Sequence, residues 1–270
     1  MRERFDQEYI RSELQRIGEE IENPLTVYLI GGGAMAFRGL KDTTKDIDLI
    51  VTDGNDLRQL QAVLLENGYE SIENPAEEYD TLGAKRILEN SDGCRIDLFN
   101  QQVIDKLVLS EGMRERGKQY LTAGNLSVAL VSSEDIFLFK AVAGRNDDID
   151  DMFTLFQTDL DFDSIEAELA QQIELLGQEL FISHMNEALQ ELETRHNIST
   201  PLRDIVSETT ERVYRELEIL QAFDDAVTSF DLDERVTLSE AEIAEAVQSL
   251  ESKGVISIED GLIIKETDSL

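Results

Sequence analysis

The 270-residue sequence is poor in several residue types that define whole classes of protein. It contains a single cysteine, Cys94, which excludes an internal disulfide and argues against a disulfide-rich extracellular module. The opening run MRERFDQEY lacks the apolar core of a signal peptide, and no apolar run approaches the roughly 18 residues of a membrane span. These absences predict a cytoplasmic protein without a membrane anchor.

Positive charge is also scarce. Lys and Arg total 24 against 58 Asp and Glu, so the formal net charge is −34. Only 8 of the 24 basic residues are lysine, and tryptophan is absent. This composition resembles that of proteins from salt-loving archaea, for which a cytoplasm of molar salt is expected. Because the Debye length falls to about 3 Å in molar salt, the acidity does not exclude an RNA partner.

The hydrophobic pattern predicts a mixed α/β protein in three segments. Residues 1–158 alternate between helical and strand periodicity, residues 159–232 are expected to be helical, and residues 233–270 are expected to form a small winged-helix-like unit. Helices are predicted over residues 2–21, 34–38, 56–67, 133–143 and 239–253. Strands are predicted over residues 26–30, 47–51, 69–72, 84–88, 95–99 and 126–130, with a hairpin over 255–266.

Aspartates interrupt two of these apolar strands. Asp46 and Asp48 stand two apart, so both side chains point to the same face of their strand, and Asp97 lies in the later run CRIDLF. A carboxylate buried among apolar residues costs several kcal/mol unless something pairs with it. If the two strands were adjacent, three carboxylates would raise one another's pKa, and bound metal would neutralise them. The pattern predicts a Mg²⁺ site, with two ions expected.

Three glycines, Gly31 to Gly33, follow the first apolar strand and are expected to form a turn before a short helix. Because glycine has no Cβ atom, its backbone N–H groups can approach a phosphate closely, and the start of a helix favours an anion. The turn therefore predicts a phosphate-binding element near the aspartates.

Together these residues resemble the motif of the DNA polymerase β-like nucleotidyltransferase superfamily. Gly32 and Gly33 are followed, after twelve residues, by Asp46-Ile47-Asp48, and Asp97 fits the third aspartate of that motif. Further on, SSEDIFLFKAVAGRNDDIDD resembles the downstream signature of small nucleotidyltransferases related to the AbiEii-type abortive-infection toxin. The resemblance covers residues 27–151.

The resemblance implies an enzyme that transfers NMP from an NTP to a hydroxyl group. It implies tRNA as the leading acceptor, with a protein or a small molecule as alternatives, and a protein partner that is either antitoxin-like or a second copy of the chain. The implied site residues are Asp46, Asp48 and Asp97 for catalysis and metal binding, Gly32, Gly33, Lys140 and Arg145 for the triphosphate, and Asp148, or else Asp150, for the acidic cluster that follows.

Each of these residues also has an ordinary structural explanation. The glycines fit a simple turn, Asp46 and Asp48 fit a strand end that reaches solvent, and Asp97 fits a salt bridge to a neighbouring arginine, Arg86 or Arg95. Lys140 and Arg145 fit long side chains that cover an apolar helix. The alternative function is a catalytically inactive nucleotide-binding or interaction module of the same fold.

Two further sites are not expected. His184 and His196 have no cysteine or second histidine at zinc-ligand spacing. The candidate winged helix carries four glutamates against one lysine over residues 239–253, so sequence-specific DNA binding is not expected.

The charge of −34 predicts that stability depends on salt. Diluting KCl from molar to millimolar removes the screening between carboxylates, so the free energy of unfolding should fall. Thermal unfolding at the two concentrations should give midpoints that differ by more than about 5 °C. Equal midpoints would contradict this prediction.

Overall fold

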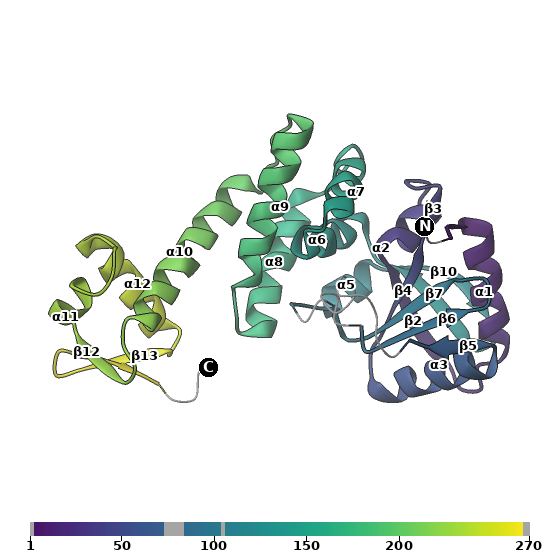
Figure 1. Cartoon of the computed structure of the whole chain (residues 1–270), viewed down its shortest axis with the longest axis horizontal. Helices are drawn as coiled ribbons and strands as arrows, with labels where there is room; N and C mark the ends of the chain where they lie inside the picture. The colour runs from purple at the N-terminus through teal and green to yellow at the C-terminus, as the bar shows by residue number, and fades with distance from the viewer. Residues whose placement is uncertain (1–2, 73–83, 104–105, 267–270) are drawn as a thin grey trace. The chain divides into compact units, whose positions relative to one another are not determined.

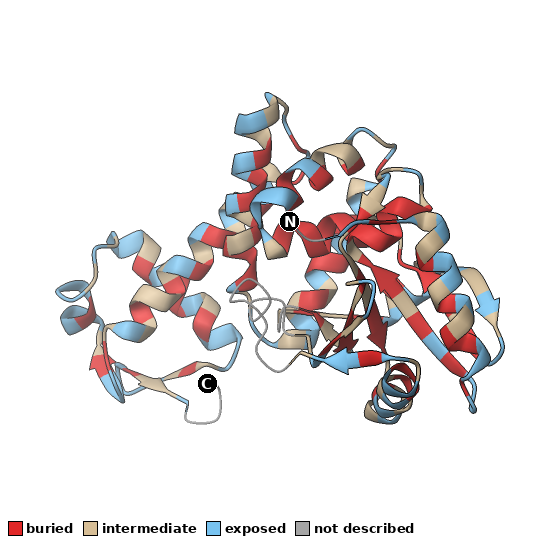
Figure 2. Cartoon of the chain, turned by 45° about the vertical axis from the view of Figure 1, so that its right-hand side comes forward, coloured by how far each residue is buried: buried red, intermediate tan, exposed pale blue. Residues whose placement is uncertain are grey.

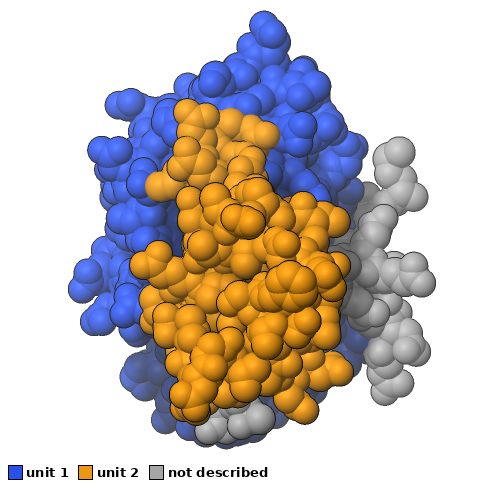
Figure 3. Space-filling view, turned by 90° about the vertical axis from the view of Figure 1, so that its left-hand side faces the viewer, with its two compact units in different colours: residues 1–202 blue, residues 203–270 orange. Residues whose placement is uncertain are grey.

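The computed structural model describes residues 3–72, 84–103 and 106–266. They belong to two compact units, Met1–Leu202 and Arg203–Leu270, which Figure 3 colours separately. Figure 2 shows buried residues along the strands and on the inner faces of the helices in each unit. No helix in the described ranges is both long and apolar enough to cross a membrane.

The first unit is built on a seven-stranded mixed sheet (Figure 1). Its strands are β2 (Leu25–Ile30), β4 (Asp46–Val51), β5 (Tyr69–Ser71), β6 (Arg86–Asn90), β7 (Arg95–Asn100), β10 (Lys118–Ala123) and β11 (Leu126–Leu130). The spatial order is β10-β11-β2-β4-β7-β6-β5. The pairs β11–β2 and β4–β7 are parallel, and the other neighbours are antiparallel. The mixed α/β sheet expected from the sequence is confirmed, and β10 adds an edge strand that the sequence did not indicate.

Helices cover this sheet and extend it at one end. They are α1 (Gln7–Glu19), α2 (Gly31–Phe37), α3 (Gly54–Glu66), α5 (Glu111–Arg116), α6 (Ser133–Ala143), α7 (Asn146–Phe156), α8 (Phe162–Leu176) and α9 (Phe181–His196). Helix α1 packs on β10 and β11, and α3 packs on β4, β5 and β7. Helix α6 contacts α2, α7, α8 and α9, so it forms the centre of a helical cluster beside the sheet.

Two short strand pairs accompany the main sheet of the first unit. Strand β1 (Phe5–Asp6) pairs with β3 (Thr43–Thr44), and β8 (Gln102–Val103) pairs with β9 (Leu107–Val108). The β1–β3 pair ties the chain just before β4 to the N-terminal segment.

Helix α6 is capped at both ends, and a tight turn joins it to α7. The Ser132 hydroxyl accepts a hydrogen bond from the Asp135 backbone N–H at 3.1 Å, as expected for the start of α6. Gly144 ends α6 in the left-handed region at φ 60°. Helix α7 begins two residues later, so the last turn of α6 lies beside the first turn of α7.

Two predicted helices begin at other residues than expected. Helix α1 starts at Gln7, because Phe5 and Asp6 pair with β3 and the Asp6 carboxylate caps the helix through the Tyr9 backbone N–H at 2.9 Å. Its expected start, Arg2, lies outside the described residues. Helix α2 starts at Gly31 instead of residue 34, because Gly31 alone makes the turn at φ 61° and the next two glycines already lie in the helix.

The second unit contains the helix and hairpin expected for a winged-helix-like fold. Its elements are α10 (Arg203–Gln221), β12 (Ala226–Thr228), α11 (Ser229–Asp233), α12 (Glu240–Ser252), β13 (Ile256–Glu259) and β14 (Leu262–Lys265). The strands form one sheet in the order β12-β14-β13, and α10 packs on α12.

The expected helical segment over residues 159–232 is divided between the two units. Helices α8 and α9 pack on α6 in the first unit, whereas α10 belongs to the second. Residues 226–228, expected to be helical, form β12, because Val227 pairs with Ile263 across the small sheet and both side chains are buried.

The second unit has its own buried core, so we expect residues 203–270 to unfold cooperatively when expressed alone. The core includes Leu250, which is 2% exposed, whereas Leu262 is 39% exposed. Leu250→Ala should cost about 2 to 5 kcal/mol and abolish or strongly weaken the transition. Leu262→Ala, the matched control, should change the urea midpoint little. A fragment without a cooperative transition would contradict the prediction.

Candidate active site

A cavity of about 590 Å³ lies in the first unit between the strands β4 and β7 and the helix α7, a volume typical of a small-molecule site. Its lining is almost entirely charged or polar. Six aspartates line it, namely Asp46, Asp48, Asp97, Asp147, Asp148 and Asp151, together with five basic residues, namely Arg4, Lys41, Lys45, Lys140 and Arg145. The remaining lining residues are Gly32, Thr43, Thr44 and Asn146.

The strand aspartates of the sequence motif are brought together on one side of the cavity. Strands β4 and β7 are parallel neighbours, and their register places Asp48 directly beside Asp97. Asp97 is fully buried, with 0% of its surface exposed. The strand of Asp97 thus lies next to that of Asp46 and Asp48, which is the arrangement that the metal-site hypothesis required.

Asp48 is a weaker acid than an ordinary aspartate, because it is buried beside another carboxylate. Burial, and to a lesser extent the nearby Asp46 carboxylate, raise the pKa of the Asp48 carboxyl to about 6. Arg145 and Lys140, across the cavity, act in the opposite direction without cancelling the rise. The site therefore holds its negative charge at a cost, which a bound cation would relieve.

The strand aspartates are the donors available to a divalent cation in this cavity. Among the residues that the structure describes, no three His, Cys, Asp or Glu side chains converge as a ready-made metal group. Mg²⁺, however, usually keeps several waters and takes only one or two carboxylates plus substrate phosphates. Asp46 and Asp48, with Asp97 in register, supply hard oxygen ligands of this kind, so the residues fit a Mg²⁺ ion that arrives with a nucleotide.

The glycines at the start of α2 serve the cavity in different ways. A Cβ atom on Gly31 would collide with the Asp48 carboxylate oxygen Oδ2, and one on Gly32 would lie 2.5 Å from Thr44 Oγ1. Gly32 lines the cavity as expected, but Gly33 instead packs against Leu29 of β2. Gly31, which the motif comparison passed over, is the glycine that the position of Asp48 requires.

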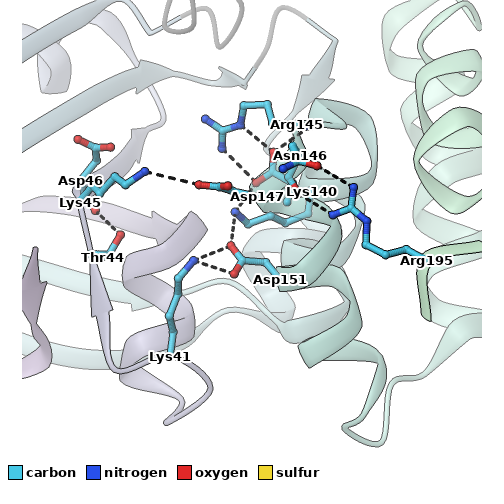
Figure 4. A network of polar contacts seen from close by, with 11 residues as sticks. Lys41, Thr44, Lys45, Asp46, Lys140, Arg145, Asn146, Asp147, Asp151 and Arg195 are labelled. Carbon is cyan, nitrogen blue, oxygen red and sulfur yellow. Dashed lines mark hydrogen bonds and ion pairs between the residues drawn. The ribbon is translucent and has the colours of Figure 1, made fainter. Parts of the chain in front are cut away.

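The opposite side of the cavity carries a network of ion pairs around Asp148, and Figure 4 labels its members Lys140, Arg145 and Asp151. Lys140 Nζ lies 2.5 Å from Asp148 Oδ1 and 2.8 Å from Asp151 Oδ2. The Arg145 guanidinium donates to both oxygens of Asp148, from Nε at 2.7 Å and from Nη2 at 3.1 Å. Lys140 is only 6% exposed, so it is not a surface lysine covering an apolar helix.

Opposite charges in this network favour the ionised forms of Lys140 and Asp148. Burial alone would lower the pKa of Lys140, but Asp148 and Asp151 outweigh burial and raise it. Burial likewise would raise the pKa of Asp148, yet Lys140 and Arg145 hold it below its usual value. The expected residues Lys140, Arg145 and Asp148 thus form one ion-paired cluster, in which Lys140 and Asp148 are buried and Arg145 is partly exposed.

Two lysines that the sequence did not single out complete this side. Lys41 Nζ lies 2.7 Å from Asp151 Oδ1, and Lys45 Nζ lies 3.5 Å from Asp147 Oδ2. Both lysines lie between α2 and β4, a segment without helical or strand periodicity. Lysine is scarce in this sequence, and that scarcity was the signal that could have identified them. Two of only 8 lysines lie within five residues of the Asp46-Ile47-Asp48 strand.

Helix α9 fixes the start of α7. Arg195 donates from Nη2 to the Asn146 side-chain oxygen at 2.7 Å and from Nη1 to the Asn146 backbone carbonyl at 3.3 Å (Figure 4). Because Asn146 is the first residue of α7, this contact helps to hold the acidic first turn against the cavity.

The comparisons with known proteins agree with the motif. A family model described as a nucleotidyltransferase of unknown function (DUF6036) matches residues 8–194, which include every lining residue except Arg4. The chain belongs to this nucleotidyltransferase family and is therefore a group-transfer enzyme by descent.

The other comparisons add little. No curated protein matches the chain. Among solved structures, the chain is similar to JHP933 from Helicobacter pylori, with 15% sequence identity over 80% of this chain and 99% of that chain and a TM-score of 0.35. Likeness of this degree carries no argument about the site.

The raised pKa of Asp48 predicts that Asp48→Asn stabilises the metal-free protein. The folded-state pKa of about 6 lies above the ordinary value of 3.8, so stability is lost as pH rises through about 6. Asparagine cannot ionise, so at pH 8 in EDTA the variant should be about 1 to 3 kcal/mol more stable. Below pH 4 the difference should vanish. Urea unfolding at both pH values checks this, and a less stable variant at pH 8 would contradict it.

Proposed function

We propose that the protein is a Mg²⁺-dependent nucleotidyltransferase that moves an NMP group from an NTP to a hydroxyl acceptor. The family supports transfer of a nucleotidyl group in general. The observation that carries the finer proposal is the arrangement of two charged clusters across one cavity, with Asp48 and Asp97 in register on one side and Lys140 and Arg145 on the other.

Each cluster matches one half of the reaction. The acceptor oxygen attacks the α-phosphorus, the bond from the α-phosphorus to the bridging oxygen breaks, and pyrophosphate leaves with that oxygen. Bound between Asp46, Asp48 and Asp97, Mg²⁺ would stabilise the negative charge that develops on the reacting oxygens. Asp97 accepts the proton that the acceptor hydroxyl releases. Arg145 and Lys140 stabilise the phosphates of the leaving group.

The start of α2 orients the triphosphate in this proposal. Gly31 and Gly32 bring backbone close to Asp48 and Thr44 with no side chain in between. Gly33 acts indirectly, because its packing on Leu29 lets α2 lie against β2.

The acceptor is proposed from the resemblance to the toxin-like branch, which makes the 3′ end of tRNA the leading candidate. A protein or small-molecule hydroxyl is the next candidate, and an antitoxin-like protein or a second copy is the proposed partner. The charge of −34 fits activity in molar salt, where repulsion between the protein and RNA is screened.

The alternative is a nucleotide-binding module that has lost turnover. The long acidic helices after Ile165 would then serve as an interaction surface for a partner. Tight NTP binding without any product distinguishes this alternative from the enzyme.

We expect Asp46→Asn and Asp97→Asn each to lower transfer by roughly 100-fold or more, because each removes a charge that the transition state needs. The assay incubates the protein in high KCl and Mg²⁺ with each α-³²P-labelled NTP and total tRNA, and reads the label on a gel. Label on RNA, or on the protein itself, identifies the acceptor class.

The matched control is Asp163→Asn, which removes one carboxylate from the exposed first turn of α8, outside the cavity. It should keep full activity, and thermal unfolding should show that all three variants are folded. Full transfer by Asp46→Asn and Asp97→Asn would overturn the proposed mechanism.

A further inference from the structure

Two lysine side chains span the cavity from the sheet side to α7. The segment that carries Lys41 and Lys45 is fixed by the β1–β3 pair, in which Thr44 lies opposite Phe5. From there Lys45 extends to Asp147 and Lys41 extends to Asp151, as Figure 4 shows. Both bridges therefore cross the space where a triphosphate would lie between the two charged clusters.

The outer bridge is a weak contact. The side chains of Lys45 and Asp147 are 43% and 78% exposed, and their charged atoms are 3.5 Å apart. Exposed ion pairs of this kind contribute little to stability. A lysine ammonium sits on a flexible four-carbon stem with three rotatable donors, so it can turn from a carboxylate to a phosphate at small cost.

The inner bridge is more buried but is also shared. The side chains of Lys41 and Asp151 are 29% and 11% exposed, and Asp151 also binds Lys140 Nζ at 2.8 Å. If Lys41 turned away, Lys140 would still neutralise Asp151. The inner lysine can therefore leave its partner without stranding a buried charge.

The cavity is much less acidic than the chain as a whole, so it repels an anion less than the net charge suggests. Six aspartates face five basic residues there, although the whole chain has 58 acidic and 24 basic residues. A triphosphate carries more negative charge than one carboxylate, so it attracts a lysine more strongly. It would also lie closer to the strand aspartates than Asp147 and Asp151 do, and a cation has to accompany it there.

We propose that Lys45 and Lys41 bind the phosphates of the nucleotide, and that Asp147 and Asp151 hold these lysines in the nucleotide-free protein. Nucleotide binding is then an exchange in which each lysine replaces a carboxylate with a phosphate. This inference rests on the proposed function and adds two ligands outside the residues that the motif singles out.

The exchange makes the two members of the outer bridge act in opposite directions. Lys45→Met removes a phosphate ligand and weakens binding. Asp147→Asn removes the competitor for Lys45 and tightens binding. If the bridge were purely structural, either substitution would break the same contact, and both would change binding in the same direction or not at all.

A double-mutant cycle separates exchange from simple repulsion between Asp147 and the ligand. In the Lys45→Met background, Asp147 has no lysine to hold, so Asp147→Asn should no longer tighten binding. Repulsion alone would give the same tightening in both backgrounds.

The experiment titrates inorganic triphosphate with Mg²⁺ into the full-length protein and measures the heat of binding, so that the base of the nucleotide does not matter. We expect Lys45→Met and Lys41→Met each to weaken binding about fivefold, and Asp147→Asn to tighten it about threefold. Asp42→Asn removes the same charge from the lysine segment without touching the cavity lining, and it should leave the affinity unchanged.

The outcomes distinguish the inference from the proposed function. A wild-type protein that binds neither triphosphate nor any of the four α,β-methylene nucleoside triphosphates overturns both. Wild-type binding with Asp147→Asn unchanged or weaker, or with equal tightening in the Lys45→Met background, overturns only the exchange. Thermal unfolding of each variant verifies that the protein titrated is folded.

Discussion

The parallel pairing of β4 with β7 is the constraint on which the site depends. This pairing places Asp48 beside Asp97 at the end of the sheet where α2 begins. Because adjacent strands lie about 4.8 Å apart, no shift of side chains can separate the two carboxylates far. A slip of one residue would turn Asp48 to the other face of the sheet, among buried apolar side chains.

Basic residues on the other side of the cavity compensate for this concentration of negative charge. The α6–α7 turn, closed by Gly144, sets Lys140 and Arg145 around Asp148 at the far side of the cavity. These two cations limit the rise in the pKa of Asp48 and hold the pKa of Asp148 below its usual value. Asp148 thus orients Lys140 and Arg145, and these cations reduce the electrostatic cost of the strand aspartates. The cavity is close to neutral in a protein whose surface is strongly acidic.

The sequence predicts the helices and strands in which apolar residues recur at a regular spacing. It also predicts the site residues that interrupt such a spacing or belong to a motif. Asp48 and Asp97 stand out because each interrupts an apolar strand, and Lys140 and Asp148 stand out through a motif on two adjoining helices. Asp151 follows Asp148 by three residues and lies on the same helical face, so the helical spacing could have identified it as well.

The remainder depends on long-range contacts that no local pattern records. Lys41 and Lys45 lie in an irregular segment, and their partners are on α7, more than one hundred residues away along the chain. Gly31 is set apart from its neighbours by its positive φ and by its close approach to Asp48. Strand β12 was not predicted for the same reason, because its partner strand β14 lies near the end of the sequence of the second unit.

The most direct test of the central claim is a crystal of the protein soaked with Mn²⁺ and an α,β-methylene nucleoside triphosphate. The account predicts an anomalous peak for manganese against the carboxylates of Asp46, Asp48 or Asp97, with the phosphates lying between that ion and Arg145. A triphosphate bound elsewhere, or a cavity that contains the nucleotide with no ion against these aspartates, would contradict it.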